Sequence, residues 1–249
     1  MKIEGARTLV TGGGRGIGLE LAKALHGLGA RIAICGRDPD TLERARGTIG
    51  GGSVCISADV ADPDAPLELV RHVREAFGGL DILINNAAIQ LNYSFFDRPY
   101  AELASDIERE VVVDLVAPIR LSAAMLPLLR ESQDAAIVNL GSGLGLAPKT
   151  SAPVYCATKA ALRTFSRALG YQAEAQAPSL KVIDVTLPIV DTDMTKGRGS
   201  GKISASDAAA QIVSGMQRDR KEVYVGKAGL FSIIMRMAPS VGYGMLKGS

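Results

Sequence analysis

The sequence contains no tryptophan, and only 4% of its 249 residues are aromatic. Proteins that bind single-stranded nucleic acid rely on aromatic side chains that stack on bases, so this composition disfavours that class. The charge is also nearly balanced, with 28 basic and 26 acidic residues. Because polyanion binders concentrate positive charge, we expect a small-molecule substrate and no nucleic-acid partner.

Cysteine and long apolar runs are scarce as well. Cys35, Cys55 and Cys156 have neither the paired nor the C-x-x-C spacing of a disulfide framework or a zinc site. We therefore expect reduced, buried thiols and no metal. No apolar run precedes the first strand pattern, and the apolar stretch near the C-terminus is interrupted by Arg236, so we expect no membrane span and a cytoplasmic location.

Short apolar, β-branched runs alternate with longer helical patterns along the chain. The strand candidates are RTLVT, RIAIC, SVCIS, LDILIN, AAIVNLG, KVIDVTL and EVYVG. Helical patterns cover 16–28, 64–77, 100–130 and 154–175. This alternation is typical of an α/β protein with a parallel sheet covered on both faces. We predict one domain over 1–249, a Rossmann-type, doubly wound sheet of about seven strands, with a glycine-rich mobile loop at 196–202.

A glycine-rich turn, TGGGRGIG at 11–18, follows the first strand directly and leads into a helix. Gly12 suits backbone angles that other residues avoid, Gly16 permits close approach of a pyrophosphate, and Gly18 permits tight packing of helix on strand. The helix N-terminus offers free N–H groups to an anion. We predict a dinucleotide site that includes Gly12, Gly14, Arg15, Gly16, Ile17 and Gly18.

The end of the second strand, ICGRD, indicates which dinucleotide is preferred. Sheets that bind NAD usually place an acidic residue there on the ribose 2′-hydroxyl, but this chain has Gly36 followed by Arg37. Arg37 and Arg15 can hold a 2′-phosphate through forked N–H donors. We predict a preference for NADP(H), while the adjacent Asp38 leaves NAD(H) possible.

Three polar residues later in the chain suggest a reacting centre. Ser142 ends the fifth strand, and Tyr155 and Lys159 are four residues apart on the following helix, so the last two share one helix face. Together with TGGGRGIG and NNAA at 85–88, these residues resemble the short-chain dehydrogenase/reductase superfamily from the first strand to about Thr195. The C-terminal part resembles a subgroup typified by an oxidoreductase of bacterial D-alanylation operons.

The resemblance implies hydride transfer between a nicotinamide and a carbonyl or alcohol. Tyr155 would be the acid or base, Ser142 would bind the carbonyl oxygen, and Lys159 would hold the nicotinamide ribose. A nearby cation favours phenolate, so we expect Lys159 to lower the pKa of Tyr155. The resemblance also implies cofactor contacts for Asp59, Val60, Asn86, Ala87, Pro188, Val190 and Thr192.

Some positions depart from the family pattern. Ala88 and Ile189 replace glycines, and Asp114 stands where the family commonly has an asparagine that holds a water of the proton relay. An aspartate lacks the amide donor and adds a negative charge near Lys159, so the relay would be slower or differently tuned. We count Asp114 with the catalytic residues.

The sequence indicates the substrate and the partners less specifically than the cofactor. The segments 88–93, 143–154 and 189–205 should contact the substrate, and their mostly apolar or small residues are compatible with an uncharged carbonyl compound. The segment 228–249 suits packing in a homodimer or homotetramer, or against the pocket. Two rival functions remain: a nucleotide-binding regulatory or scaffolding protein with little turnover, and a methyltransferase, which the tyrosine and lysine pair disfavours.

Overall fold

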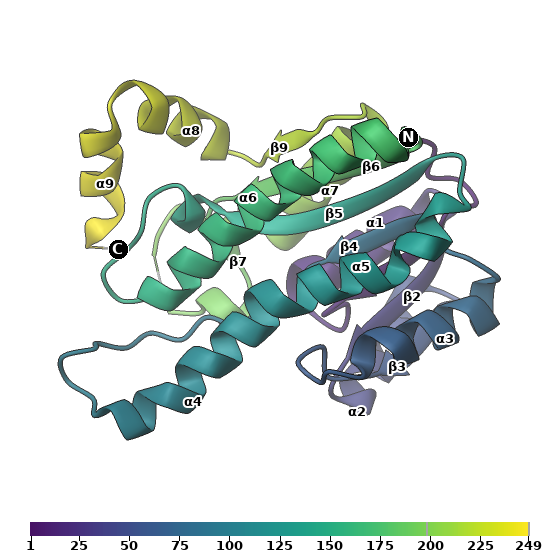
Figure 1. The fold of residues 1–249 in the computed structure, drawn as a ribbon, viewed down its shortest axis with the longest axis horizontal. Helices are drawn as coiled ribbons and strands as arrows, with labels where there is room; N and C mark the ends of the chain where they lie inside the picture. The colour runs from purple at the N-terminus through teal and green to yellow at the C-terminus, as the bar shows by residue number, and fades with distance from the viewer. Residues whose placement is uncertain (198, 249) are drawn as a thin grey trace.

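The computed structural model describes residues 1–197 and 199–248. Its centre is a parallel sheet with the strand order β3-β2-β1-β4-β5-β6-β9 (Figure 1). The strands are β1 (Arg7–Thr11), β2 (Arg31–Gly36), β3 (Val54–Ser57), β4 (Ile82–Asn85), β5 (Ala135–Ser142), β6 (Leu180–Leu187) and β9 (Glu222–Tyr224). The prediction of an α/β fold with seven parallel strands is confirmed.

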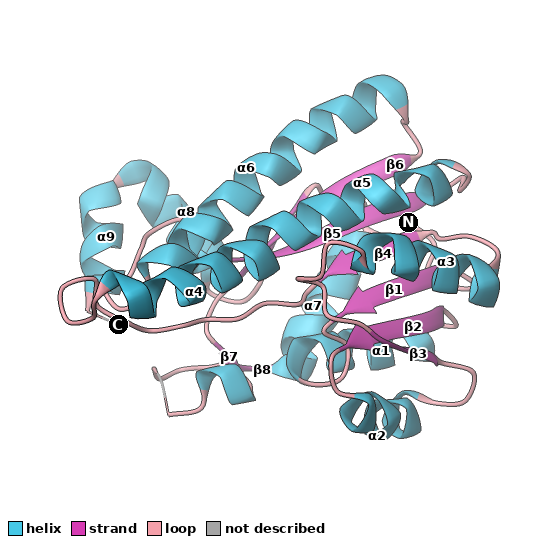
Figure 2. Cartoon of the chain, turned by 60° about the horizontal axis from the view of Figure 1, so that its bottom comes forward, coloured by secondary structure: helices cyan, strands magenta, loops and turns pink. Residues whose placement is uncertain are grey.

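Helices cover both faces of the sheet (Figure 2). One face carries α1 (Gly16–Gly27), α2 (Pro39–Ile49) and α7 (Ala205–Gln217), whose apolar side chains form one core cluster with the strands. The other face carries α3 (Ala65–Phe77), α5 (Ala117–Arg130) and α6 (Pro153–Gln176), which form the second cluster. Successive strand residues point to opposite faces, so Val10 joins the first cluster and Leu9 the second. Burial on both faces explains why the strands are apolar throughout.

The strand order places the ligand site. β1 pairs with β2 on one side and with β4 on the other, so the chain leaves β1 and β4 on opposite sides of a crevice. In open α/β sheets, ligands bind at such a switch point, outside the carboxyl ends of the strands. The glycine turn after β1 and the NNAA segment after β4 both lie at this edge.

The long helix predicted over 100–130 is interrupted in its backbone geometry. α4 (Tyr100–Val111) passes into a π-helical turn, Val112–Val116, and then into α5. By length and composition alone Tyr100–Arg130 is apolar enough to cross a membrane. However, Leu121, Met125 and Leu128 are fully or almost fully buried in the second core cluster, so this is a core helix of the sheet.

Beyond β6 the chain builds two smaller units. A short pair of strands, β7 (Val190–Asp191) and β8 (Ile203–Ser204), frames the segment that includes the predicted loop at 196–202, of which position 198 lies outside the described residues. After β9, helices α8 (Ala228–Met237) and α9 (Pro239–Lys247) form a hairpin that extends from one end of the molecule (Figures 1 and 2).

Candidate active site

The glycine turn adopts the backbone conformation that its sequence predicts. Gly12 and Gly16 have φ angles of 64° and 57°, which glycine adopts without a steric penalty. A Cβ on Gly12 would lie 3.0 Å from the Cα of Ala87, and one on Gly14 would lie 3.0 Å from Cγ2 of Thr41. The turn therefore lies close to two neighbouring segments and directs the N-terminus of α1, with its unpaired N–H groups, toward the crevice.

Gly18 and Asn86 hold this turn against the end of β4. The Asn86 amide donates hydrogen bonds to the carbonyls of Thr11 and Gly12, at 2.8 and 3.1 Å. A Cβ on Gly18 would lie 2.4 Å from both Nδ2 of Asn86 and the Gly12 oxygen. The described contacts of Asn86 therefore shape the turn, and Gly18 permits the close packing that the sequence predicts.

A cavity of about 430 Å³ lies beside the turn. Its walls include these predicted site residues: Gly12, Gly14, Arg15, Gly16, Ile17, Arg37, Asp59, Val60, Asn86, Ala87, Tyr155, Lys159 and Thr192. The structure thus brings segments from β1 to β7 together around one space. The glycine cradle, the basic residues and the space fit a dinucleotide.

Five predicted residues are not among those that line the cavity, and the structure shows what each of them contacts. Gly18 packs against Asn86, Ser142 bonds to Tyr155, and Asp114 faces Lys159. Val190 is 3% exposed and belongs to a core cluster. Pro188 lies beside Gly226, whose built Cβ would be 3.7 Å from its ring.

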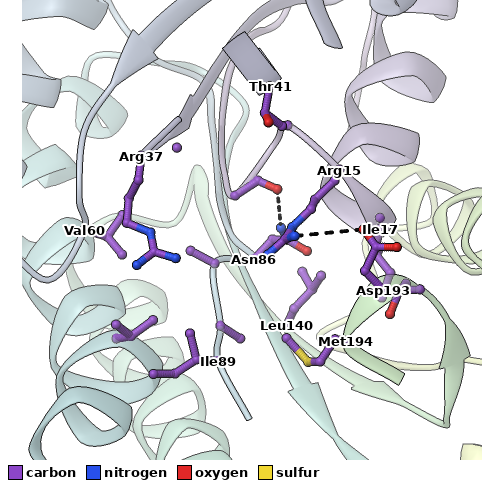
Figure 3. Close-up of a pocket in the computed structure, with 18 of the residues that line it drawn as sticks. Arg15, Ile17, Arg37, Thr41, Val60, Asn86, Ile89, Leu140, Asp193 and Met194 are labelled. Carbon is purple, nitrogen blue, oxygen red and sulfur yellow. Dashed lines mark hydrogen bonds and ion pairs between the residues drawn. The ribbon is translucent and has the colours of Figure 1, made fainter. Parts of the chain in front are cut away.

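The basic end of the cavity combines Arg37 with groups from other elements. Arg37 lies near Val60, while Arg15 points toward Asp193 on the other side, with 3.9 Å between Nη1 and Oδ2 (Figure 3). Asp38 is the N-cap of α2, where its carboxylate accepts from the Asp40 N–H at 3.1 Å. That role engages the Asp38 carboxylate at the start of α2, although Asp38 lines the cavity together with Arg37.

Asp59 is tied to a residue that sequence reasoning missed. Its Oδ2 accepts from Nη2 of Arg109 at 2.7 Å, and its Oδ1 accepts from the Ala61 N–H at 3.0 Å. These bonds and the charge of Arg37 lower the pKa of Asp59 against the opposing effect of burial. Arg109 lies on α4, far from Asp59 in sequence, so no local motif identifies it. The cavity wall also includes Thr41, Leu140 and Leu187, which no motif in the sequence indicates, and Met194, which lies in the predicted substrate segment 189–205.

Ser142 and Tyr155 meet at the inner end of the cavity. The Ser142 hydroxyl donates to the phenol oxygen and lowers the pKa of Tyr155, while Oγ of Ser142 accepts from the Leu144 N–H at 3.1 Å. Burial of Tyr155 and the negative charge of Asp114 act in the opposite direction and prevail, so the pKa of Tyr155 is raised. The prediction that Lys159 lowers the pKa of Tyr155 is therefore wrong for this structure.

The position of Lys159 explains this difference. Its ammonium donates to the Leu140 carbonyl at 3.3 Å, lies 3.9 Å from Oδ2 of Asp114, and is 5.5 Å from the centroid of the Tyr155 ring. Lys159 is 4% exposed and Asp114 is fully buried. The lysine charge is thus compensated by an anion before it can favour phenolate.

Asp114 lies within the π-helical turn and contacts the segment after β4. Its Oδ1 accepts from the Ile89 N–H at 2.8 Å, whereas its buried Oδ2 has no hydrogen-bond partner among the described residues. Burial raises the pKa of Asp114 to about 6, although Lys159 and the Ile89 amide oppose the rise. π-Helical turns are frequent at functional sites, and this one directs a carboxylate at the lysine.

A second buried carboxylate, Glu110, was not selected from the sequence. It lies one turn before Asp114, is fully buried, and accepts from the Leu91 N–H at 2.8 Å and the Tyr93 hydroxyl at 3.2 Å. Burial raises its pKa. Glu110 and Asp114 together fasten the segment 89–93 to the long helix, beside the predicted substrate side.

A further hollow of about 610 Å³ adjoins the start of α6. It is lined by aromatic and small neutral residues: Asn92, Tyr93, Ser94, Phe95, Phe96, Thr150, Ser151 and Pro153. The Tyr93 N–H donates to the Ser151 carbonyl at 3.0 Å and joins its two walls. These residues belong to two of the segments predicted to contact the substrate.

Comparison with known proteins agrees with this arrangement. The short chain dehydrogenase family model matches residues 6–202. The uncharacterized oxidoreductase DltE of Bacillus subtilis is 35% identical over 229 residues, which cover 90% of this chain and 89% of DltE. A fatty acyl-CoA reductase of Acinetobacter baylyi is 29% identical over 249 residues, which cover 96% of this chain and 82% of that enzyme.

A solved structure extends the comparison to the fold. A short chain dehydrogenase/reductase from Burkholderia phymatum in complex with NAD superposes with a TM-score of 0.87 at 20% identity, covering 100% of this chain and 97% of that one. With the family match and the DltE match, the conclusion is that the chain belongs to the short-chain dehydrogenase/reductase family of oxidoreductases.

Proposed function

We propose that the protein is an NADP(H)-dependent oxidoreductase that interconverts a carbonyl compound and an alcohol. One observation carries the proposal: Ser142, Tyr155 and Lys159 meet at the inner end of the cavity that begins at the glycine turn. A bound nicotinamide supplies or accepts the hydride at the substrate carbon. The chain's own residues hold the substrate oxygen and move its proton.

Each of the three residues has a distinct task in reduction. Ser142 and Tyr155 donate hydrogen bonds to the carbonyl oxygen, where negative charge develops. Because its pKa is raised, the phenol of Tyr155 keeps its proton at neutral pH and can deliver it to that oxygen. In alcohol oxidation the proton moves the other way, so Tyr155 must first lose its own.

Lys159 and Asp114 control the charge around that proton. Lys159 would hold the nicotinamide ribose, and Asp114 would accept from a water or from Lys159 with its free Oδ2. A cation and an anion in contact, both buried, leave little net charge beside Tyr155. This pair would act as the relay that returns a proton to Tyr155 after each turnover.

Arg37 and Arg15 support NADP(H) over NAD(H). Both lie on the cavity wall, and Asp38, the nearby acid, is engaged as the α2 N-cap. Arg37 would bind a 2′-phosphate through charged hydrogen bonds, and Arg15, which lies across the cavity near Asp193, adds a second positive charge to the wall. The hollow beside Tyr93 and Pro153 is lined by no charged side chain among the described residues, which favours an uncharged and partly apolar substrate.

The test is a panel of ketones, aldehydes, quinones and alcohols, each assayed with NADPH or NADP⁺ and with the NAD forms. Tyr155→Phe should bind NADPH with nearly unchanged affinity and lose turnover by roughly a thousand-fold, the scale of general acid catalysis. Wild-type turnover in that variant would refute the role of Tyr155. If neither variant nor wild type changes its melting temperature with NADPH, the nucleotide site itself is wrong.

Cell location and assembly are part of the same proposal. The three cysteines are free, and Cys35 and Cys156 are buried, as expected in a reducing compartment such as the cytoplasm. We propose a homodimer or homotetramer, which light scattering of the purified chain would test. A regulatory protein without turnover is the alternative, and the substrate panel separates it from the enzyme.

A further inference from the structure

The hairpin of α8 and α9 packs mainly on itself. Gly242 lies so close to Met235 that an added Cβ would be 2.1 Å from the sulfur, and Phe231 approaches Gly143 at the edge of the catalytic domain. Ala228 and Gly242 are the buried residues of the two helices. The hairpin therefore has a closed inner side and an open outer side.

The outer side carries large apolar residues. Leu230, Ile233 and Met237 are 63%, 60% and 79% exposed, and their spacing places them on one stripe of α8. On α9, Val241 and Met245, four residues apart, are each 56% exposed. Scattered exposed apolar residues are ordinary, but five on two consecutive short helices indicate an interaction surface.

All the charge on this hairpin has one sign. Lys227, Arg236 and Lys247 are exposed, and no acidic residue follows Glu222 in the sequence. The cations are no denser after Glu222 than before it, but no acidic side chain offsets them there, whereas the chain as a whole is nearly neutral with 28 basic and 26 acidic residues. An apolar stripe flanked by cations is complementary to a surface that has negative charge on the outside and an apolar interior.

We propose that the α8–α9 hairpin is a peripheral membrane-binding surface that recognises bilayers with anionic headgroups. An amphipathic helix lies in the interface with its apolar side among the acyl chains and its cations among the headgroups. A second copy of the chain fits less well. In a two-fold contact the same patch meets itself, so the hairpin of the second copy offers no acidic side chain to pair with the three cations.

The hairpin is also connected to the hollow beside the reacting centre. The carbonyl of Lys247, at the end of α9, accepts from both the N–H and the hydroxyl of Thr150, at 3.1 and 2.6 Å. Thr150 lines the hollow together with Phe95 and Phe96, which are 50% and 99% exposed. Membrane contact would thus occur at the end of the molecule where the hollow opens.

Vesicle flotation of the full chain tests the proposal without any turnover. Vesicles of phosphatidylcholine and phosphatidylglycerol in equal parts should carry the protein, and vesicles of phosphatidylcholine alone should carry much less. Ile233→Ser combined with Met237→Ser should reduce binding by roughly ten-fold or more, because two apolar side chains no longer enter the bilayer. Arg236→Glu should reduce binding to the anionic vesicles and increase its sensitivity to salt.

Matched controls lie elsewhere on the surface. Leu67→Ser changes an apolar residue of α3 that is 70% exposed, and Arg218→Glu changes an exposed cation at the end of α7; neither should alter binding. Melting curves with NADPH show whether each variant is folded. No flotation of the wild type, or equal losses in the controls, overturns the proposal. If the hairpin variants instead convert a dimer to a monomer in light scattering and vesicles are not bound, the partner is a second copy.

Discussion

The ammonium of Lys159 lies 3.9 Å from Oδ2 of Asp114, and both side chains are buried next to Tyr155. The pair places a compensating anion beside a cation that would otherwise favour loss of the Tyr155 proton. Asp114 raises the pKa of Tyr155, and burial raises it further. This relationship keeps the phenol of Tyr155 protonated at neutral pH.

Asp114→Asn should shift the pH dependence of alcohol oxidation. Oxidation needs deprotonated Tyr155, so its rate rises with pH toward the pKa of that residue. Removal of the Asp114 charge removes a cause that raises this pKa, and the rising limb should move to lower pH. Initial rates of alcohol oxidation across pH check this. An unchanged limb, with NADP⁺ affinity intact, would mean that Asp114 does not act on the proton of Tyr155.

The same residue should contribute to the pH dependence of stability. The pKa of Asp114 rises from 3.8 to about 6 on folding, so the native state binds more protons between these values. The contribution of Asp114 to the free energy of unfolding is therefore largest below pH 3.8 and is lost as pH rises through about 6. The total change in this free energy is about 3 kcal/mol at most.

Urea unfolding of wild type and Asp114→Asn at several pH values measures this contribution. The variant should gain relative to wild type as pH rises from 4 toward 7. Asp184, whose pKa burial also raises to about 6, is unchanged in both proteins and cancels in the difference. A difference that is constant with pH would contradict the assignment.

Arg37→Asp should change the choice of cofactor. An aspartate there repels a 2′-phosphate and loses charged hydrogen bonds, so NADPH affinity should fall by more than roughly ten-fold while NADH affinity changes little. Fluorescence titration with both nucleotides measures the ratio. Arg130→Asp, an exposed cation at the end of α5, is the control and should leave both affinities unchanged. Equal losses of affinity for NADPH and NADH would show that Arg37 does not bind the 2′-phosphate.

Glu110→Ala should affect the substrate side more than the cofactor. The substitution leaves the Leu91 N–H and the Tyr93 hydroxyl without their acceptor, which costs about 1–3 kcal/mol and loosens the segment 89–93. We expect a higher KM for the carbonyl substrate with NADPH affinity nearly unchanged. Glu110→Gln keeps an acceptor oxygen for Leu91 and should recover part of the loss. If KM is unchanged in a folded Glu110→Ala protein, the segment does not contact the substrate.

Gly18→Ala should damage the nucleotide site and the fold together. Its methyl group would lie 2.4 Å from the Asn86 amide and from the Gly12 carbonyl, so the turn must open. Overpacking of this kind costs about 1–3 kcal/mol, and NADPH should bind weakly or not at all. Gly27→Ala lies on the same helix with nothing within 4 Å of the new methyl group. That control should keep both its stability and its NADPH affinity in thermal melts.

Much of the fold follows from local patterns in the sequence. The seven sheet strands are continuous apolar runs because both faces of the sheet are buried, and each was predicted close to its observed bounds. The glycine turn was predictable because its conformation depends on residues within one short segment. The helix α2 was not among the predicted helical stretches, although the Asp38 cap and Pro39 at its first position are typical of a helix start.

The candidate site was only partly predictable. Glycines, serine, tyrosine and lysine occupy a recognisable spacing, but Arg109 reaches Asp59 only through the tertiary fold. Likewise, in the sequence Glu110 is one more acidic residue of an amphipathic helix. Only the structure reveals that Leu91 and Tyr93 donate hydrogen bonds to it. The raised pKa of Tyr155 depends on how completely three side chains are buried, which spacing along a helix does not reveal.

The widened turn at Val112–Val116 has a consequence for how the chain tolerates changes in length. Upstream of it, Glu110 faces the segment after β4; downstream, Leu121 and Met125 face the sheet. A π-helical turn holds one residue more than an α-helical turn, so deletion of one residue within it can be absorbed by ordinary α-helical winding while both flanking helices keep their faces. Deletion of one residue from α4 or α5 would instead rotate one half against the other by about 100°, so we expect the π turn to tolerate shortening better than the regular helix on either side.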